Sequence, residues 1–275
     1  MALLSPADTR ALAARLDVAP VKSRGQNFLI DPNTVRRIVK LADLGSHYDV
    51  LEIGPGLGSL TLGLVGAGAR VTAVELDPVL AAALPETVAT RLPNSAHQLT
   101  VLAGDALHVD IPDEATVLAA NLPYNVAVPL LLRLLRDLPR IDHGVVMVQA
   151  EVAHRLAAPP GSRVYGVPSA KLAWYASSKV AAPVPRTVFW PQPRVDSALL
   201  TFARRDPPPG DRQRTFDVID AAFAGRRKTL RVALARWAGS PAEAERRLRA
   251  AGVDPGLRGE ALDVKDFACI AQQAS

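Results

Sequence analysis

Between residues 49 and 150 the chain alternates short apolar runs with helical patterns. Five runs rich in Val and Leu, each followed by a polar or glycine-containing turn, are YDVLEIG, ARVTAVEL, LTVLAGD, ATVLAANL and HGVVMVQ. Helical patterns such as SLTLGLVGAG and PVLAAALPETVATRL lie between them. Continuous apolar runs are typical of strands buried on both faces, and the intervening helices are typical of parallel crossovers. The sequence therefore predicts an α/β fold with a doubly wound parallel sheet.

The stretch RRDPPPGDR, residues 204–212, divides the chain into two parts. Its three prolines and one glycine cannot continue a strand or a helix. Helical patterns follow it, and Ser240 and Pro241 mark the start of one of them as N-cap and first helical residue. We expect a larger domain over residues 1–205, with residues 1–45 as an N-terminal segment, and a small all-helical domain over residues 206–275.

Positive charge is concentrated in the last quarter of the chain. Residues 1–203 carry 18 Lys and Arg against 17 Asp and Glu, whereas residues 204–275 carry 14 against 10. Within that part Arg226, Arg227, Lys228 and Arg231 lie at helical spacing and are candidates to follow a nucleic-acid backbone. A solvated helical face would have the same pattern, so both interpretations stay open here.

Several classes of protein are disfavoured by composition. No apolar stretch reaches the roughly 18 residues of a membrane span, because Arg133 and Arg136 interrupt the best candidate. The N-terminus has Asp8 and Asp17 and no apolar core of a secretory signal. The single Cys269 excludes an intrachain disulfide and a Cys-based zinc cluster. We expect a cytoplasmic protein without a bound metal, and nothing in the sequence requires more than a monomer.

A glycine-rich loop, LEIGPGLGSLT, joins the first strand to its helix. Gly54, Gly56 and Gly58 lack the spacing of the dinucleotide-binding fingerprint, which argues against a nucleotide-dependent dehydrogenase. Glycines at this place let the backbone approach a ligand at the carboxyl edge of the sheet. A plain tight turn is the alternative.

Acidic residues end the next two strands. Glu75 lies 21 residues after Gly54, where an acid can accept hydrogen bonds from ribose hydroxyls. Asp105 follows the third strand and can accept from an adenine amine. Each acid alone can equally be a solvated loop residue or a helix cap. Three successive strand ends with such groups together favour a nucleoside-binding edge.

The fourth strand ends in Asn121-Leu122-Pro123-Tyr124. An aromatic exocyclic amine is a poor nucleophile, and two acceptors, the Asn121 side chain and the Leu122 carbonyl, would orient its hydrogens and lone pair. Pro123 stiffens the turn, and Tyr124 offers a face for a base taken out of its stack. The pattern predicts methylation of an amine on a planar base and favours adenine N6, although DNA adenine and cytosine N4 enzymes use related turns. An Asn turn before a Pro-stiffened helix start is the alternative.

These strand ends resemble those of S-adenosylmethionine-dependent methyltransferases, which hold methionine, ribose and adenine there. In one subgroup a GQNFL segment, matched here by Gln26, Asn27 and Leu29, covers part of the cofactor. The resemblance implies a Rossmann-like methyltransferase sheet and a site for S-adenosyl-L-methionine. The residues that it assigns to this cofactor are Gln26, Asn27, Leu29, Gly54, Gly56, Glu75, Leu76, Asp105, Ala106 and Asn121.

The segment from Phe189 to Ser197 reads FWPQPRVDS and matches the FxPxPxVDS pattern of the rRNA adenine N6-dimethyltransferases. With GQNFL, NLPY and GRRKTLR in the same order over about residues 20–270, the chain most resembles the small-subunit branch, whose absence is associated with kasugamycin resistance. The resemblance implies that Phe189 forms a wall of the target-adenine pocket opposite Tyr124. It also implies dimethylation of two adjacent adenines in a hairpin loop near the 3′ end of 16S rRNA during small-subunit assembly.

Two other functions remain open at this stage. Relatives that methylate 23S rRNA and confer macrolide resistance usually read NIPY or NIPF and have a less developed C-terminal domain. A ribosome-assembly or RNA-binding factor with secondary catalysis is the other alternative, against which the intact Glu75, Asp105, Asn121 and Tyr124 argue. The proline-rich linker departs from the family pattern and leaves the RNA contacts open.

Overall fold

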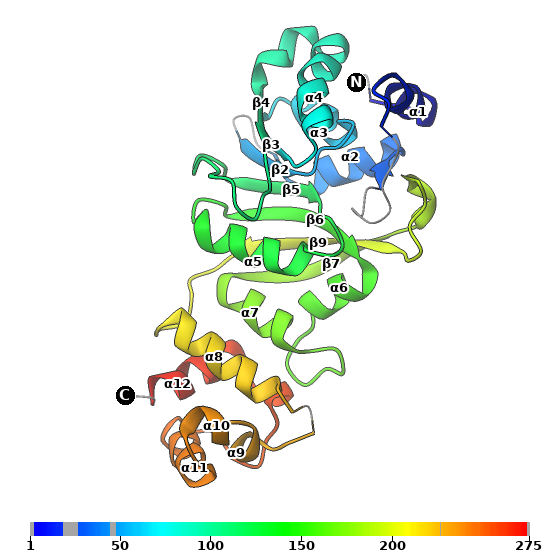
Figure 1. Ribbon diagram of the computed structural model, residues 1–275. Coiled ribbons are helices and arrows are strands. Elements are labelled where there is room, and N and C mark those ends of the chain that lie inside the picture. Colours follow the sequence, from blue (N-terminus) through cyan, green and yellow to red (C-terminus); the bar gives the residue numbers. More distant parts are fainter. Residues whose placement is uncertain (1–2, 19–26, 45–47, 226, 274–275) are drawn as a thin grey trace. The chain divides into compact units, whose positions relative to one another are not determined.

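The computed structural model describes residues 3–18, 27–44, 48–225 and 227–273, so the predicted site residues Gln26 and Arg226 lie outside the described residues (Figure 1). The chain forms two compact units. The first comprises Met1–Ala153 with Lys179–Ala203, and the second comprises His154–Ser178 with Arg204–Ser275. The sequence was divided at one point, between residues 205 and 206, whereas the chain passes between these units more than once. The assignment of functional domains stays a prediction.

A seven-stranded sheet organises the first unit, in the order β4-β3-β2-β5-β6-β9-β7. The first five in that order pair in parallel, as predicted, and β9 pairs antiparallel with β6. The sheet strands are β2 (Asp49–Ile53), β3 (Arg70–Glu75), β4 (Leu99–Ala103), β5 (Val117–Asn121), β6 (His143–Gln149), β7 (Ala176–Val184) and β9 (Ser197–Arg204). Two short strands, β1 (Phe28–Leu29) and β8 (Phe189–Trp190), form a separate antiparallel pair.

The helices of this unit begin where the sequence supplies caps. Asp31 and Asp77 each accept hydrogen bonds from backbone N–H groups of the first turn, and a proline follows each of them, at the start of α2 (Pro32–Leu41) and α4 (Pro78–Arg91). The other helices are α1 (Pro6–Arg15), α3 (Ser59–Gly66), α5 (Ala127–Asp137) and α6 (Ala150–Leu156). The central strand β5 carries Val117, Leu118 and Ala119 at 0% exposure, which explains its uninterrupted apolar run.

The strand order changes direction at β2. From this strand the chain proceeds to β3 and β4 on one side, and β5 and β6 lie on the other side. The carboxyl ends of β2 and β5 therefore flank a topological switch point, where open α/β sheets bind their ligands. The parallel register Leu51↔Leu118 brings the glycine loop after β2 next to Asn121 at the end of β5.

The second unit is built of helices, as expected for the end of the chain. They are α7 (Val167–Tyr175), α8 (Arg212–Phe223), α9 (Leu230–Ala233), α10 (Ala235–Ala238), α11 (Pro241–Ala250) and α12 (Val264–Gln272). Phe223 and Phe267 pack with ring centroids 6.1 Å apart, and Leu230 and Leu248 are fully buried. Ser240 caps α11 by accepting from the backbone N–H of Glu243, as its position predicted.

The basic run does not lie on one helix. Its residues were expected at helical spacing, but α8 ends at Phe223 and α9 begins only at Leu230. Gly225 follows the end of α8, and its carbonyl accepts from the Lys228 N–H at 2.8 Å, which closes a turn. Glycine is costly inside a helix, so the chain turns here and the predicted helical face does not form.

No helix in the described part of the chain is both long and apolar enough to cross a membrane.

Candidate active site

The predicted ligand groups lie in a row along the carboxyl edge of the sheet. In the order of the strands they are Asp105 after β4, Glu75 at the end of β3, Gly54 after β2 and Asn121 at the end of β5. Neighbouring strand ends are joined directly: the Gly104 N–H donates to the Glu75 carbonyl at 2.8 Å, and the Gly54 N–H donates to the Val74 carbonyl at 2.9 Å. The topology thus brings together groups that are far apart in the sequence.

The glycine loop is tightly covered. Gly54 and Gly56 have φ of 67° and 58°, in the left-handed region that favours glycine. A Cβ on Gly56 would lie 3.0 Å from the Phe28 ring, and one on Gly54 would lie 3.8 Å from the Asn121 carbonyl oxygen. Phe28 therefore closes over the loop only because glycine stands beneath it.

Glu75 fixes this loop from the neighbouring strand. One carboxylate oxygen accepts from the Gly56 N–H at 3.0 Å and the other accepts from the Asp77 N–H at 2.9 Å. The residue is 6% exposed, and burial raises its pKa although both backbone bonds act in the opposite direction. A carboxylate has about four lone-pair positions, so the two bonds described here leave acceptor capacity for a ligand hydroxyl.

Asn121 has one satisfied and one unsatisfied polar atom. Its Nδ2 donates to the Asn27 backbone carbonyl at 3.2 Å, which fixes the amide orientation. Its Oδ1 is buried and has no hydrogen-bond partner among the described residues. An unpaired buried acceptor costs about 1–3 kcal/mol, so this oxygen is a candidate to accept a hydrogen bond from a ligand.

The turn after Asn121 is anchored on both sides. The Leu122 N–H donates to the Met147 carbonyl at 3.1 Å, and the Leu122 side chain is 1% exposed. The Tyr124 hydroxyl lies 2.6 Å from Ser197 Oγ, at the start of β9. Ser197 is the last residue of the FxPxPxVDS segment, and the sequence assigned it no role. This contact joins two segments 73 residues apart in the chain, so no local pattern announces it.

These groups line a cavity of about 80 Å³ at the switch point. The predicted residues that it brings together are Asn27, Gly54, Gly56, Glu75, Asn121, Leu122, Pro123 and Tyr124, with Phe28 and Leu80 in addition. A smaller adjoining cavity of about 30 Å³ shares Asn27, Gly54, Gly56 and Asn121 and adds Leu29 and Glu52.

Leu76, Asp105 and Ala106 lie further along the edge and line neither cavity. Leu76 is 64% exposed immediately after β3. Asp105 accepts from the Leu107 N–H at 2.8 Å and lies 3.1 Å from the His108 ring. The Leu107 bond, with a smaller contribution from His108, lowers the pKa of Asp105. Its carboxylate is therefore ionised and accessible.

Phe189 is buried in the core, and its role as a wall of the target-adenine pocket stays a prediction. The structure puts its side chain in the hydrophobic core at 1% exposure and not along the cavity that Tyr124 lines. The antiparallel pair Leu29↔Phe189 explains this, because it holds β8 against β1 and leaves Phe189 facing inward. Its strand neighbour Trp190 is only half-buried and lies 6.2 Å from the Phe28 ring centroid.

Glu52 is a site residue that the sequence interpretation missed. It is 1% exposed in β2, lines the smaller cavity and accepts from the Thr61 hydroxyl at 2.7 Å. Burial raises its pKa to about 8, and the Glu75 carboxyl adds to this effect. The sequence signal that could have identified Glu52 is an acidic residue inside an otherwise apolar strand. Among the described residues no group of His, Cys, Asp and Glu is arranged to hold a metal ion.

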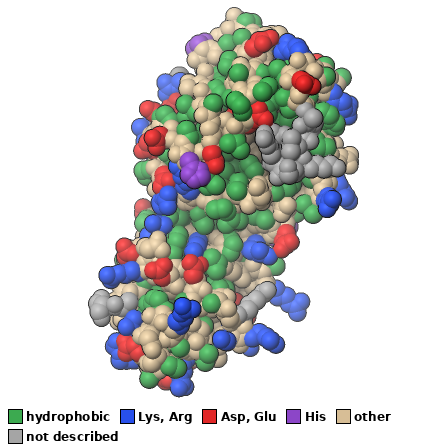
Figure 2. Space-filling model, viewed as in Figure 1, with side chains coloured by type: hydrophobic (Ala, Val, Ile, Leu, Met, Phe, Trp, Pro, Cys, Tyr) green, Lys and Arg blue, Asp and Glu red, His purple; other side chains and the backbone are tan. Residues whose placement is uncertain are grey.

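The basic candidates of the second unit lie in and after the turn that interrupts the expected helix. Arg227 and Lys228 are exposed and form no ion pair with another described residue. Arg231 is also exposed, but its Nε lies 3.3 Å from Glu245. On the face shown in Figure 2, cationic side chains of this unit are interspersed with acidic ones.

Comparison with known proteins gives a consistent result. Residues 21–273 match the family model described as ribosomal RNA adenine dimethylase. A protein of Thermobifida fusca named ribosomal RNA small subunit methyltransferase A is 59% identical over 98% of this chain and 96% of its own. A protein of Kineococcus radiotolerans with the same name is 60% identical over 98% of this chain and 91% of its own.

Solved structures share the fold. A dimethyladenosine transferase from Plasmodium falciparum superposes with a TM-score of 0.76 at 23% identity, covering 88% of this chain and 95% of that one. The 23S rRNA methyltransferase ErmE superposes with a TM-score of 0.65 at 27% identity, covering 90% of this chain and 99% of that one.

Proposed function

Because this chain belongs to the ribosomal RNA adenine dimethylase family, it is an S-adenosylmethionine-dependent rRNA adenine dimethyltransferase, and we propose that its substrate is the small-subunit rRNA. The proposed targets are N6 of two adjacent adenines in a hairpin loop near the 3′ end of 16S rRNA, modified while the small subunit assembles. The unpaired Asn121 Oδ1 at the switch point of the sheet supports methylation of an amine at this turn, and the identity of 59–60% to relatives named for the small subunit supports the choice of substrate.

The described residues fit the proposed cofactor. A glycine loop without room for a Cβ under Phe28 suits a ligand that approaches the backbone, and Glu75 keeps lone pairs for ribose hydroxyls. The cavity is smaller than the ~300–1,000 Å³ typical of ligand pockets, so it takes only a part of such a ligand. Leu76 and Asp105, exposed at the next two strand ends, are the proposed contacts for the adenine. S-adenosylmethionine supplies, when bound, a methyl group on a positively charged sulfur.

The proposed work of the turn is to make the adenine amine nucleophilic. Asn121 Oδ1 and the Leu122 carbonyl accept the two N6 hydrogens, which draws the nitrogen lone pair out of conjugation with the ring. The Asn27 carbonyl and the Met147 carbonyl hold these two acceptors in place, so the site is ordered before the base enters. A proton leaves N6 after the new C–N bond forms, and no strong base is needed before that.

Tyr124 is proposed to carry the target base. Its hydroxyl is tied to Ser197, which fixes the ring plane and leaves the aromatic face for stacking. Stacking of a base on an aromatic side chain is worth about 1–3 kcal/mol, which offsets part of the cost of taking the base out of its loop. A monomethylated adenine retains one N6 hydrogen, so its second methylation requires only one of the two acceptors.

The alternatives are less well supported. The 23S rRNA methyltransferase shares 27% identity with this chain, whereas full-length relatives at 59–60% are named for the small subunit. An assembly factor without catalysis would have no use for an unpaired acceptor beside a cofactor loop. We further propose that the protein acts as a monomer in the bacterial cytoplasm, where its proposed ribosomal substrate assembles.

Methyl transfer to defined substrates tests the proposal. The protein is incubated with labelled S-adenosylmethionine and either undermethylated small subunits, large subunits, naked rRNA or duplex DNA, and the labelled bases are mapped. We expect N6,N6-dimethyladenine at two adjacent positions near the 3′ end of 16S rRNA. Label found only in 23S rRNA or in DNA would contradict the proposed substrate.

A further inference from the structure

Arg133 is an unexpected residue in the middle of α5. Leu130, Leu131 and Leu134 of this helix are buried inside the first unit. Arg133 lies among them in the sequence, and its side chain is only 21% exposed. A largely buried guanidinium must have partners, because an unpaired buried charge is very costly. In the sequence, Arg133 stands out only as an interruption of the best candidate for a membrane span.

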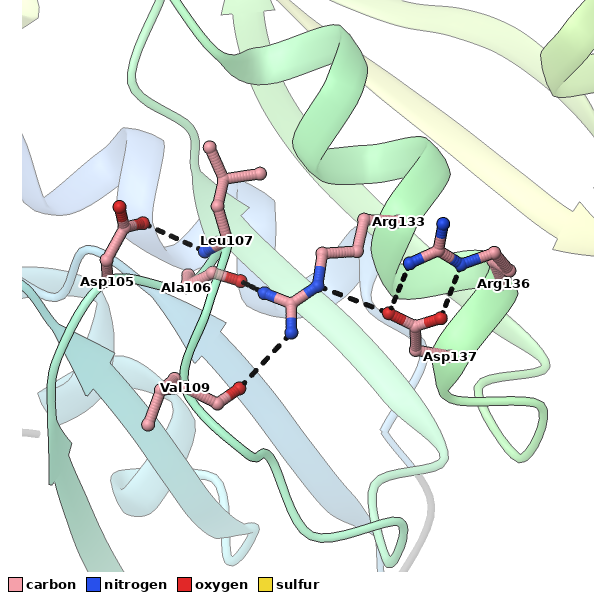
Figure 3. A network of polar contacts seen from close by, with 7 residues as sticks. All are labelled: Asp105, Ala106, Leu107, Val109, Arg133, Arg136 and Asp137. Carbon is pink, nitrogen blue, oxygen red and sulfur yellow. Dashed lines mark hydrogen bonds and ion pairs between the residues drawn. The ribbon is translucent and has the colours of Figure 1, made fainter.

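The partners of Arg133 belong to a loop on another strand. One terminal nitrogen, Nη1, donates to the Ala106 carbonyl, and the other, Nη2, donates to the Val109 carbonyl at 3.3 Å. Its Nε donates to Asp137 Oδ2 at 3.2 Å, one helical turn further along α5. Figure 3 shows the guanidinium lying between the loop and Asp137, with one bond on the helix side and two on the loop side.

The loop in question, residues 104–109, is called the Asp105 loop below. Inside it the Asp105 carbonyl accepts from the N–H groups of His108 and Val109, each at 2.8 Å. Gly104 at its start has φ of 158° and donates to the Glu75 carbonyl. The loop is therefore a compact turn attached at its start to β3, and Arg133 attaches its far side to α5.

We propose that Arg133 is a positioning residue for the cofactor: by holding the carbonyls of Ala106 and Val109, it sets the Asp105 loop at the angle from which Asp105 accepts the adenine amine. This inference rests on the proposed function, which places the cofactor adenine beside Asp105. It adds a direct link between that loop and the helix that follows the Asn121 turn.

The chemistry of arginine suits this role. A guanidinium presents a planar fork of N–H donors that reaches two carbonyls and a carboxylate at once, whereas lysine offers one mobile charge. Asp137 is itself held by Arg136, at 2.8 Å through Nη2, so the acceptor on the helix side is fixed as well. The charge of Arg133 also acts on Asp105, where it helps to lower the pKa after the larger effects of Leu107 and His108.

The test compares how tightly the full-length protein binds the product of the cofactor and an inosine analogue of that product. S-adenosylhomocysteine carries the adenine amine, and S-inosylhomocysteine carries a carbonyl oxygen in its place. Calorimetry gives both dissociation constants for wild type, Arg133→Met, Arg133→Lys and the reference variant Asp105→Asn. Arg140→Met is the control, because it removes an exposed arginine shortly after α5 and leaves Asp137 and the bonds from Arg133 to the loop in place.

For Arg133→Met we expect S-adenosylhomocysteine to bind about tenfold more weakly, the effect of about one hydrogen bond. Binding of the inosine analogue should change little, so the preference for adenine narrows. Arg133→Lys should recover part of that preference, and Arg140→Met should keep all of it. At saturating cofactor the rate of methyl transfer should stay within a few fold of wild type, because the Asn121 turn is unchanged.

Two results would overturn the inference. One is an unchanged preference for adenine in Arg133→Met while Asp105→Asn loses it, which would leave the proposed function intact. The other is an equal loss for both ligands together with slower transfer in Arg133→Met and Arg133→Lys, which would make Arg133 a general support of the fold. An unchanged preference in Asp105→Asn would instead contradict the assignment of Asp105 itself.

Discussion

The carboxyl edge of the sheet and the basic turn after α8 were both assigned functions from sequence. The predicted residues come together at the edge, whereas the predicted helical arrangement is absent in the turn. At the edge, Gly54, Glu75 and Asn121 converge and are fixed by backbone hydrogen bonds. In the turn, the helical spacing that was to align the basic residues is absent, because α8 ends at Phe223. Side chains at strand ends are placed by the topology of the sheet, whereas those on an exposed segment depend on where a helix stops.

The first prediction concerns the edge and has the largest expected effect. Asn121→Ala should lower the rate of methyl transfer by about 10²–10³-fold, the usual cost of removing one preorganised polar group from a reacting centre. Cofactor binding should change only a few fold, because Gly54 and Glu75 remain. Steady-state kinetics and calorimetry measure the two quantities separately. Asn94→Ala, exposed in a 3₁₀ turn (Pro93–Gln98) at the amino end of β4, is the control. A near-normal rate in Asn121→Ala would contradict the acceptor role.

The second prediction uses the buried acid beneath the edge. The Glu52 pKa is about 8 in the folded protein and about 4.3 when unfolded, so between these values the unfolded chain has lost a proton that the folded chain retains. The free energy of unfolding should therefore fall as the pH rises from about 5 to 8, by a few kcal/mol from this group.

Denaturant unfolding of wild type and Glu52→Gln over this pH range measures that contribution as the difference between the two curves. We expect the variant to be less sensitive to rising pH, because glutamine does not titrate. Glu114→Gln, at an exposed position, should follow wild type. Parallel curves for wild type and Glu52→Gln would show that Glu52 titrates normally.

The third prediction separates the ring of Tyr124 from its hydroxyl. Tyr124→Ala should lower kcat/KM for the RNA by about 10–100-fold, through loss of about 1–3 kcal/mol of stacking. Tyr124→Phe keeps the ring, loses only the contact with Ser197 and should retain most of the activity. Equal losses in the two variants would assign the role to the hydroxyl and not to the aromatic face.

The fourth prediction tests the basic turn and has the smallest expected effect. The double variant Arg227→Ala/Lys228→Ala should weaken small-subunit binding about tenfold and reduce the slope of log K against log salt by about 2. Arg231→Ala should have less than half of this effect, because Glu245 already neutralises that side chain. Filter binding at several salt concentrations gives both values. If Arg231→Ala matched the double variant, the ion pair would not hold in solution.

The sequence was sufficient to predict the doubly wound sheet and the row of ligand groups. Both follow from periodicity and from the rule that parallel strands end on the same edge, which places Glu75 and Asn121 without any knowledge of side-chain contacts. The end of β5 at Asn121 and the Ser240 N-cap of α11 were predictable from local sequence signals.

Long-range packing was not predictable in this way. The pairing of Phe189 with Leu29 holds that aromatic in the core. The contact of Ser197 with Tyr124 depends on β9 pairing antiparallel with β6, which brings Ser197 to the carboxyl edge of the sheet. In the sequence Arg133 only interrupts an apolar helix. Its carbonyl partners lie on the Asp105 loop, more than 20 residues away in the chain. Such residues are recognised only when the segments that they join are seen together.

The geometry of the Asn121 turn can be tested by a crystal structure with S-adenosylhomocysteine and an RNA hairpin that carries the target adenine. We expect Asn121 Oδ1, unpaired among the described residues, to accept a hydrogen bond from the adenine N6 at about 2.8–3.1 Å, with Tyr124 stacked on the base. The acceptor role of Asn121 would be contradicted if its Oδ1 were bonded to another part of the chain and the adenine amine lay beyond hydrogen-bond distance.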